Sequence, residues 1–151
     1  MKYTYVLPIG DWSKDGHNQS ENVTMAVNKP KEEIITAYHE TTSLLNMTFD
    51  SNDMRESDPI RLINRWGDSK LDAKVVDILL QFGVRFEQFE GYQGPGCNLW
   101  IYSADEAAIL FMEFVRISLP DLEYKVVIDQ TPYLFGYWGD LNISVGYGIF
   151  E

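Results

Sequence analysis

The chain is 151 residues long and 45% hydrophobic, which is enough for one domain with a sizeable core. Its 12 basic and 23 acidic residues give a formal net charge of -11. Because phosphate contacts need clustered Lys and Arg, this charge excludes nucleic acid and anionic membranes as expected partners and leaves cations and basic proteins. Cys97 is the only cysteine, so no intramolecular disulfide can form.

The N-terminal sequence does not predict export. One positive charge precedes an apolar run that is too short for a signal peptide. No apolar run reaches the roughly 20 residues that cross a bilayer. We therefore expect a cytoplasmic protein, folded as a single domain over residues 1–151.

The first half of the chain predicts two strands followed by two helices. The strands cover residues 2–7 and 23–27 and flank a polar loop. The first helix follows Pro30, and its apolar face comprises Ile34, Ile35, Tyr38 and Leu45. The second helix begins near Asp68 and ends at Gly83, and its apolar stripe comprises Leu71, Val75, Ile78, Leu79 and Phe82.

The next segment predicts two strands and the third helix. Residues 84–89 and 99–102 have strand character and flank a Gly-rich turn. The sequence from Ser103 to Glu106 has the form of a capping box, in which the first and fourth residues satisfy each other's backbone N–H groups. The helix that follows is expected to end before Pro120.

Three further strands are predicted in the C-terminal part. Apolar and polar residues alternate over residues 122–128. Residues 133–138 and 141–150 are expected to form a hairpin around Gly139 and Asp140.

This order of elements predicts the α+β class. Short direct connections between strands favour antiparallel pairing. We therefore expect a mostly antiparallel sheet of about six to seven strands with three helices packed against it. The regular alternation of strand and helix that a parallel, doubly wound sheet requires is absent.

The loop between the first two predicted strands carries the densest run of potential ligand groups. Asp11, Ser13 and Asp15 stand at alternate positions, and Gly16 follows where a calcium loop turns sharply. Residues 11–22 thus resemble, in their first half, the calcium-binding loop of EF-hand proteins. Glu21 lies one residue before the position of the closing Glu in such loops, and the flanks are strand-like. The candidate ligands for weak binding of calcium or another divalent ion are Asp11, Ser13, Asp15 and Glu21; the identity of any other cofactor stays open.

Two other interpretations of this loop stay open. Asp-Gly is a common turn sequence, and Asp and Ser side chains form hydrogen bonds with their own backbone. A turn alone therefore explains the composition of the loop without any bound ligand. Alternatively, His17 acts as a general acid or base beside a carboxylate, in a metal-dependent or His-based hydrolase. The other histidine, His39, is expected on the exposed side of the first helix.

Aromatic and acidic side chains elsewhere predict a protein-binding surface. The candidate binding residues are Trp12, Tyr92, Trp100, Asp53 and Glu56. No Gly-x-Ser-x-Gly element or other assembled catalytic motif is present. The leading hypothesis is therefore a small acidic binding protein that acts on a basic protein partner. Its composition resembles that of small immunity and phage anti-defence proteins, which implies an inhibitory role. No oligomeric state is indicated.

Overall fold

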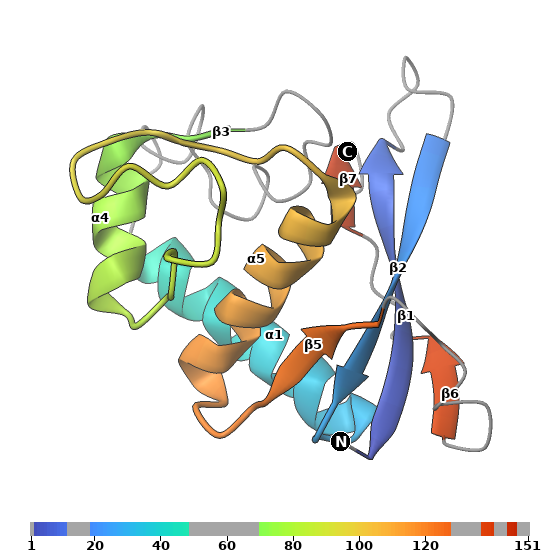
Figure 1. Ribbon diagram of the computed structural model, residues 1–151. Coiled ribbons are helices and arrows are strands. Elements are labelled where there is room, and N and C mark those ends of the chain that lie inside the picture. Colours follow the sequence, from blue (N-terminus) through green and yellow to red (C-terminus); the bar gives the residue numbers. More distant parts are fainter. Residues whose placement is uncertain (1, 12–18, 49–69, 128–136, 141–144, 148–151) are drawn as a thin grey trace.

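The computed structural model describes residues 2–11, 19–48, 70–127, 137–140 and 145–147. Within these ranges the chain forms three helices and two sheets, shown in Figure 1. The α+β class and the three helices are therefore confirmed. The arrangement of the strands is different from the expected one.

The antiparallel part of the large sheet has three strands. β1 (Tyr3–Asp11) and β2 (Gln19–Val27) pair along their whole length, from Tyr3 opposite Val27 to Asp11 opposite Gln19. β5 (Tyr124–Val126) pairs with the other edge of β2. The strand expected over residues 122–128 is thus confirmed in its central part, and the first two strands are longer than predicted.

Two short C-terminal strands pair with the remaining edge of β1, and both are parallel to it. β6 (Tyr137–Asp140) lies opposite residues 3–6, and β7 (Val145–Tyr147) lies opposite residues 9–11. Pro8 falls in the gap between these two paired stretches. Because proline has no N–H to donate, it is tolerated inside a sheet where the pairing is interrupted.

The hairpin expected around Gly139 and Asp140 is wrong. Both residues lie within β6, where they pair with Tyr5 and Val6 of β1. The local turn preference of Gly-Asp is overridden by tertiary pairing with a long strand whose edge is available. Consecutive strands that would have folded back on each other instead run along one edge in the same direction.

The expected mostly antiparallel sheet of six to seven strands is also wrong. In the described residues the large sheet has five strands, in the order β5-β2-β1-β6 with β7 beside β1, and one of its edges is parallel. β3 (Lys70–Leu71) and β4 (Leu99–Trp100) form a separate two-stranded sheet. The prediction placed in a single sheet strands that belong to two separate sheets. It also included residues 84–89, which form no strand.

Residues 84–89 fold into turns because their polar groups find other partners. The alternation of buried Val84 and Phe86 imitates a strand. The N–H of Arg85, however, donates to a side chain of the third helix, and the N–H of Phe89 donates to the carbonyl of Phe86 at 3.0 Å. Periodicity alone cannot reveal such tertiary acceptors.

α5 (Ala104–Ser118) is the helix that packs against the large sheet. It contacts β1, β2, β5 and β7, and α1 (Lys31–Thr48) packs against α5. α4 (Ala73–Gln81) lies on the other side of α5 from the large sheet (Figure 1). The expectation that all three helices pack against one sheet is therefore wrong for α4.

The core is one cluster that runs from the large sheet through α5 to α1, α4 and the loop between α4 and β4. One face of the β1–β2 pair contributes alternate buried side chains, namely Tyr5, Leu7, Ile9, Val23, Met25 and Val27. α5 is buried on nearly all sides, as expected of a helix enclosed by other elements. The ring of Phe111 lies 5.3 Å from that of Tyr38 on α1, and the Thr41 hydroxyl donates to the Phe114 carbonyl at 2.9 Å. No helix among the described residues is long and apolar enough to cross a membrane.

The helix boundaries follow the predicted signals with one exception. α1 begins directly after Pro30, whose carbonyl accepts from the N–H groups of Glu33 and Ile34. α4 ends as predicted, before Gly83, which has φ +95°. It begins at Ala73 instead of near Asp68, because the preceding Lys70–Leu71 pairs with β4.

Candidate functional site

The calcium, turn and catalytic interpretations of the first loop are not tested by the described residues. Trp12, Ser13, Asp15 and His17 lie outside the described residues, and so do Asp53 and Glu56. The backbone places Asp11 opposite Gln19 and Glu21 opposite Ile9 in the β1–β2 pair, so strands flank the loop as predicted. No group of three His, Cys, Asp or Glu side chains in the described ranges could hold a metal ion.

The segment from Leu99 to Tyr102 carries the clearest surface feature of the described structure. Its side chains alternate: Leu99 and Ile101 are buried, whereas Trp100 is 44% exposed and Tyr102 is 62% exposed. In an extended segment, residues two apart lie on the same side. The two exposed aromatics therefore lie side by side, on the outside of β4 and the residues that follow it. The sequence prediction included Trp100 and missed Tyr102, although the alternation over residues 99–102 was visible.

Gly91 brings the loop before β4 into close contact with these aromatics. A Cβ atom at this position would lie 2.9 Å from Cε2 of Tyr102 and 3.0 Å from the carbonyl oxygen of Trp100. Real Cβ atoms essentially never show the first distance, and the second is tighter than nine in ten real Cβ contacts. Any larger residue at this position would therefore force the Tyr102 ring or the loop backbone to shift.

Glu106 ties the same loop to the start of α5. Its carboxylate accepts from the backbone N–H of Glu90 at 2.9 Å and from that of Tyr102 at 3.0 Å. The predicted capping box is confirmed on its Ser103 side, since the Ser103 hydroxyl accepts from the N–H of Glu106 at 3.1 Å. The glutamate carboxylate, however, serves the residue before the cap and the neighbouring loop.

Two further side chains hold the loop that runs from α4 to β4. Asp77 on α4 accepts from the N–H of Gly96 at 2.8 Å, and Asn98 accepts from the N–H of Ala73 at 2.8 Å. Tyr92, which the sequence suggested as a binding residue, is half-buried and stacks on Phe86 with ring centres 5.7 Å apart. Its ring anchors the loop to the core.

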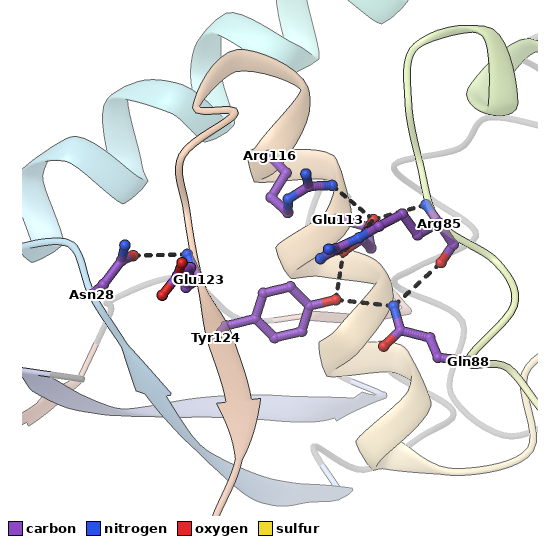
Figure 2. A network of polar contacts seen from close by, with 7 residues as sticks. All are labelled: Asn28, Arg85, Gln88, Glu113, Arg116, Glu123 and Tyr124. Carbon is purple, nitrogen blue, oxygen red and sulfur yellow. Dashed lines mark hydrogen bonds and ion pairs between the residues drawn. The ribbon is translucent and has the colours of Figure 1, made fainter.

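A buried carboxylate, Glu113, fixes the beginning of this loop, as Figure 2 shows. The backbone N–H of Arg85 donates to its Oε1 at 2.8 Å, and the Arg85 Nη2 donates to its Oε2 at 2.8 Å. The Tyr124 hydroxyl donates to Oε2 at 2.6 Å, and Nη1 of Arg116 lies 3.3 Å from Oε1. Gln88 in turn donates to the Tyr124 hydroxyl at 3.1 Å. The network therefore joins the loop to α5 and to β5.

The electrostatics of this network keep each group in one protonation state. Burial alone would raise the pKa of Glu113, but hydrogen bonds from Arg85 and Tyr124 outweigh it and leave that pKa below its ordinary value. Burial, together with the hydrogen bond to Glu113, raises the pKa of the Tyr124 hydroxyl well above its ordinary value. Glu113 is therefore ionised and Tyr124 neutral near pH 7. Since both carboxylate oxygens already accept hydrogen bonds, the network is built to fix the loop and is poorly suited to proton transfer.

A second surface feature is a shallow groove along the exposed side of α1. The described residues that line it are Thr36, His39, Glu40, Ser43, Leu44 and Met47. His39 is exposed, as the sequence predicted, and its ring lies 5.4 Å from that of Tyr38. The described lining offers one imidazole and one carboxylate, fewer ligands than a zinc site requires.

Comparison of the chain with known protein families, with curated proteins and with solved structures found no match. The function of the chain is therefore inferred from the chemistry of its own surface.

Proposed function

We propose that this chain is a non-enzymatic binding protein that engages a basic protein partner through the Trp100–Tyr102 face. We define this face as the exposed aromatics Trp100 and Tyr102 with the neighbouring carboxylates Glu90 and Asp105. The observation that carries the proposal is the exposure of both aromatics on one side of the segment Leu99–Tyr102, which begins with β4. Binding energy at protein interfaces is concentrated in large aromatic residues and Arg.

The charge of the described surface supports a basic partner. Its exposed acidic residues are Glu32, Glu33, Glu40, Glu87, Glu90, Asp105, Asp121 and Glu123. Its exposed basic residues are Lys2, Lys74, Arg85 and Lys125. The whole chain carries a formal net charge of -11, so long-range attraction speeds the encounter with a positively charged protein. Inhibitors, immunity proteins and anti-defence proteins can act in this way.

The cytoplasm is the proposed location. Cys97 is a free cysteine in the structure, and unpaired thiols suit a reducing compartment.

A capture experiment followed by reconstitution tests the proposal. The chain is immobilised, incubated with lysate of its native host at about 0.01 M ionic strength, where charges act over about 30 Å, and the retained protein is identified. That protein is then purified and its affinity is measured by calorimetry at low and high salt. We expect a basic protein whose affinity falls as salt rises. Retention of no protein, or of a partner with no excess positive charge, contradicts the proposal.

Two charge-matched double variants locate the contact. Glu90→Gln with Asp105→Asn and Glu32→Gln with Glu40→Gln each remove two exposed negative charges. The first pair lies on the Trp100–Tyr102 face and the second pair lies on α1. We expect the first to weaken binding of the purified partner more than the second. Equal weakening contradicts the proposed face.

A further inference from the structure

We infer that the Trp100–Tyr102 face binds arginine side chains of an extended segment of its partner, in preference to lysine. This inference rests on the proposed function and specifies the chemistry that the face recognises. It follows from the spacing of the aromatics, the acidic residues in the neighbouring segments and the hydrogen bonds that hold the adjoining loop.

The spacing of the two aromatics suits an extended partner segment. Trp100 and Tyr102 are two residues apart in an extended stretch, so their Cα atoms are about 6.6 Å apart along the chain. Alternate side chains of an extended partner segment have the same spacing. Two side chains of such a segment can therefore each lie over one ring.

Two exposed acidic residues, Glu90 and Asp105, belong to the segments next to the aromatics. The N–H groups of Glu90 and Tyr102 donate to the same Glu106 carboxylate, which makes these two residues neighbours. The Glu90 side chain is exposed, as is that of Asp105 in the first turn of α5. The helix dipole contributes about half a positive charge at this end, which two carboxylates in the first turn outweigh. The face therefore attracts cations.

Arginine fits this combination better than lysine. Its planar guanidinium stacks on an aromatic ring while its N–H groups bond a carboxylate in bidentate fashion. Within the molecule itself, Arg85 already makes this combination, since its guanidinium lies 6.0 Å from the centre of the Tyr124 ring and bonds the Glu113 carboxylate. Lysine offers a strongly hydrated point charge that matches neither geometry as well.

The face is held in place before any partner binds. Gly91 packs closely against a ring carbon of Tyr102, and the loop is hydrogen-bonded by Glu106, Asp77 and Glu113. A preorganised surface loses less conformational entropy on binding. Weak individual contacts between a guanidinium and an exposed ring can therefore add up to measurable affinity.

Peptide titrations monitored by NMR test the inference. The probes are Gly-Arg-Gly-Arg-Gly, the same peptide with Lys, and the same peptide with citrulline, which keeps the shape of arginine without its charge. We expect the Arg peptide to shift the indole N–H signal of Trp100 and to bind about 2–5-fold more tightly than the Lys peptide. Its affinity should fall about 2–5-fold on Trp100→Leu or Tyr102→Leu. Leucine keeps an apolar side chain and removes the ring. Met47→Leu, at an exposed position on α1, is the control and should change nothing.

Failure of the inference can be told apart from failure of the proposed function. If Arg and Lys peptides bind equally and Trp100→Leu has no effect, the preference for arginine is overturned. Capture of a basic partner would still support the proposed function in that case. If the citrulline peptide binds as well as the Arg peptide, charge is not recognised and the inference is also overturned. Thermal melts of each variant establish that it is folded.

Discussion

The backbone N–H and the side chain of Arg85 both donate to the carboxylate of Glu113, a residue 28 positions further along the chain. One buried charge on α5 thereby fixes both the path of the loop after α4 and the position of its first charged side chain. Glu113 is fully buried, whereas the Arg85 side chain is 53% exposed. Loss of the ion pair would therefore cost more free energy at the buried Glu113 carboxylate than at the Arg85 guanidinium, because water can solvate the guanidinium.

Replacing Glu113→Gln should lower the free energy of unfolding by about 1.5–3 kcal/mol. The amide keeps one acceptor oxygen, but it loses the charge that Arg85 and Arg116 share and replaces the second acceptor with an NH2 donor. The measurement is urea denaturation at pH 7. Glu87→Gln is the matched control, since Glu87 is an exposed residue of the same loop, and it should cost less than about 0.5 kcal/mol. Equal effects of the two changes would mean that the buried network does not stabilise the fold.

The acid limb of the stability profile should depend on Glu113. Its folded-state pKa lies below the value in the unfolded chain, which is about 4.3 for glutamate. Its contribution is therefore fully present above about pH 4.3 and is lost as pH falls through the folded-state pKa. The difference in unfolding free energy between the natural chain and Glu113→Gln should be constant from pH 7 to about 4.3 and shrink below it. A difference that stays constant down to about pH 3 would contradict this assignment.

Gly91→Ala should destabilise the protein by about 1–3 kcal/mol through overpacking. The added methyl group meets both a movable ring and the fixed carbonyl of Trp100. Combining it with Tyr102→Ala relieves only the first contact, so stability should recover only in part. Full recovery would show that the contact with the Trp100 carbonyl does not destabilise the protein. The measurement is the denaturant midpoint of the single and double variants.

Ser103→Ala should cost about 1 kcal/mol, because the hydroxyl that caps α5 is lost. Ser43→Ala makes the same chemical change at an exposed position inside α1, where alanine is the better helix former, and should be neutral or slightly stabilising. Thermal denaturation of both variants tests the pair. A cost at Ser43 equal to that at Ser103 would remove the capping role.

The loop of residues 11–22 can be tested with metal ions, since any ligand that binds only the folded state raises the melting temperature. Under the turn interpretation we expect no shift with calcium, magnesium, manganese or zinc, and a loss of stability on Asp11→Asn without any ion. A rise with calcium that Asp15→Asn abolishes would instead establish the calcium site at Asp11, Ser13, Asp15 and Glu21.

Local patterns in the sequence were sufficient for the helices and for part of the sheet. Pro30, Gly83 and the Ser103 cap mark helix ends through their own backbone chemistry, which is the same in any fold. The alternation over residues 99–102 likewise determines that Trp100 and Tyr102 share a side, and their exposure follows once Leu99 and Ile101 are buried. The capping box at Ser103 predicted the first hydrogen bond of α5.

The tertiary structure decided which backbone and side-chain groups that are far apart in the chain form hydrogen bonds with each other. Gly139 and Asp140 became part of a parallel strand because the edge of β1 offered them hydrogen bonds. The residues after α4 became a fixed loop because Glu113 accepts the N–H of Arg85. Both choices depend on which acceptor lies within about 3 Å in the folded chain, and this is a property of long-range packing that no window of neighbouring residues contains.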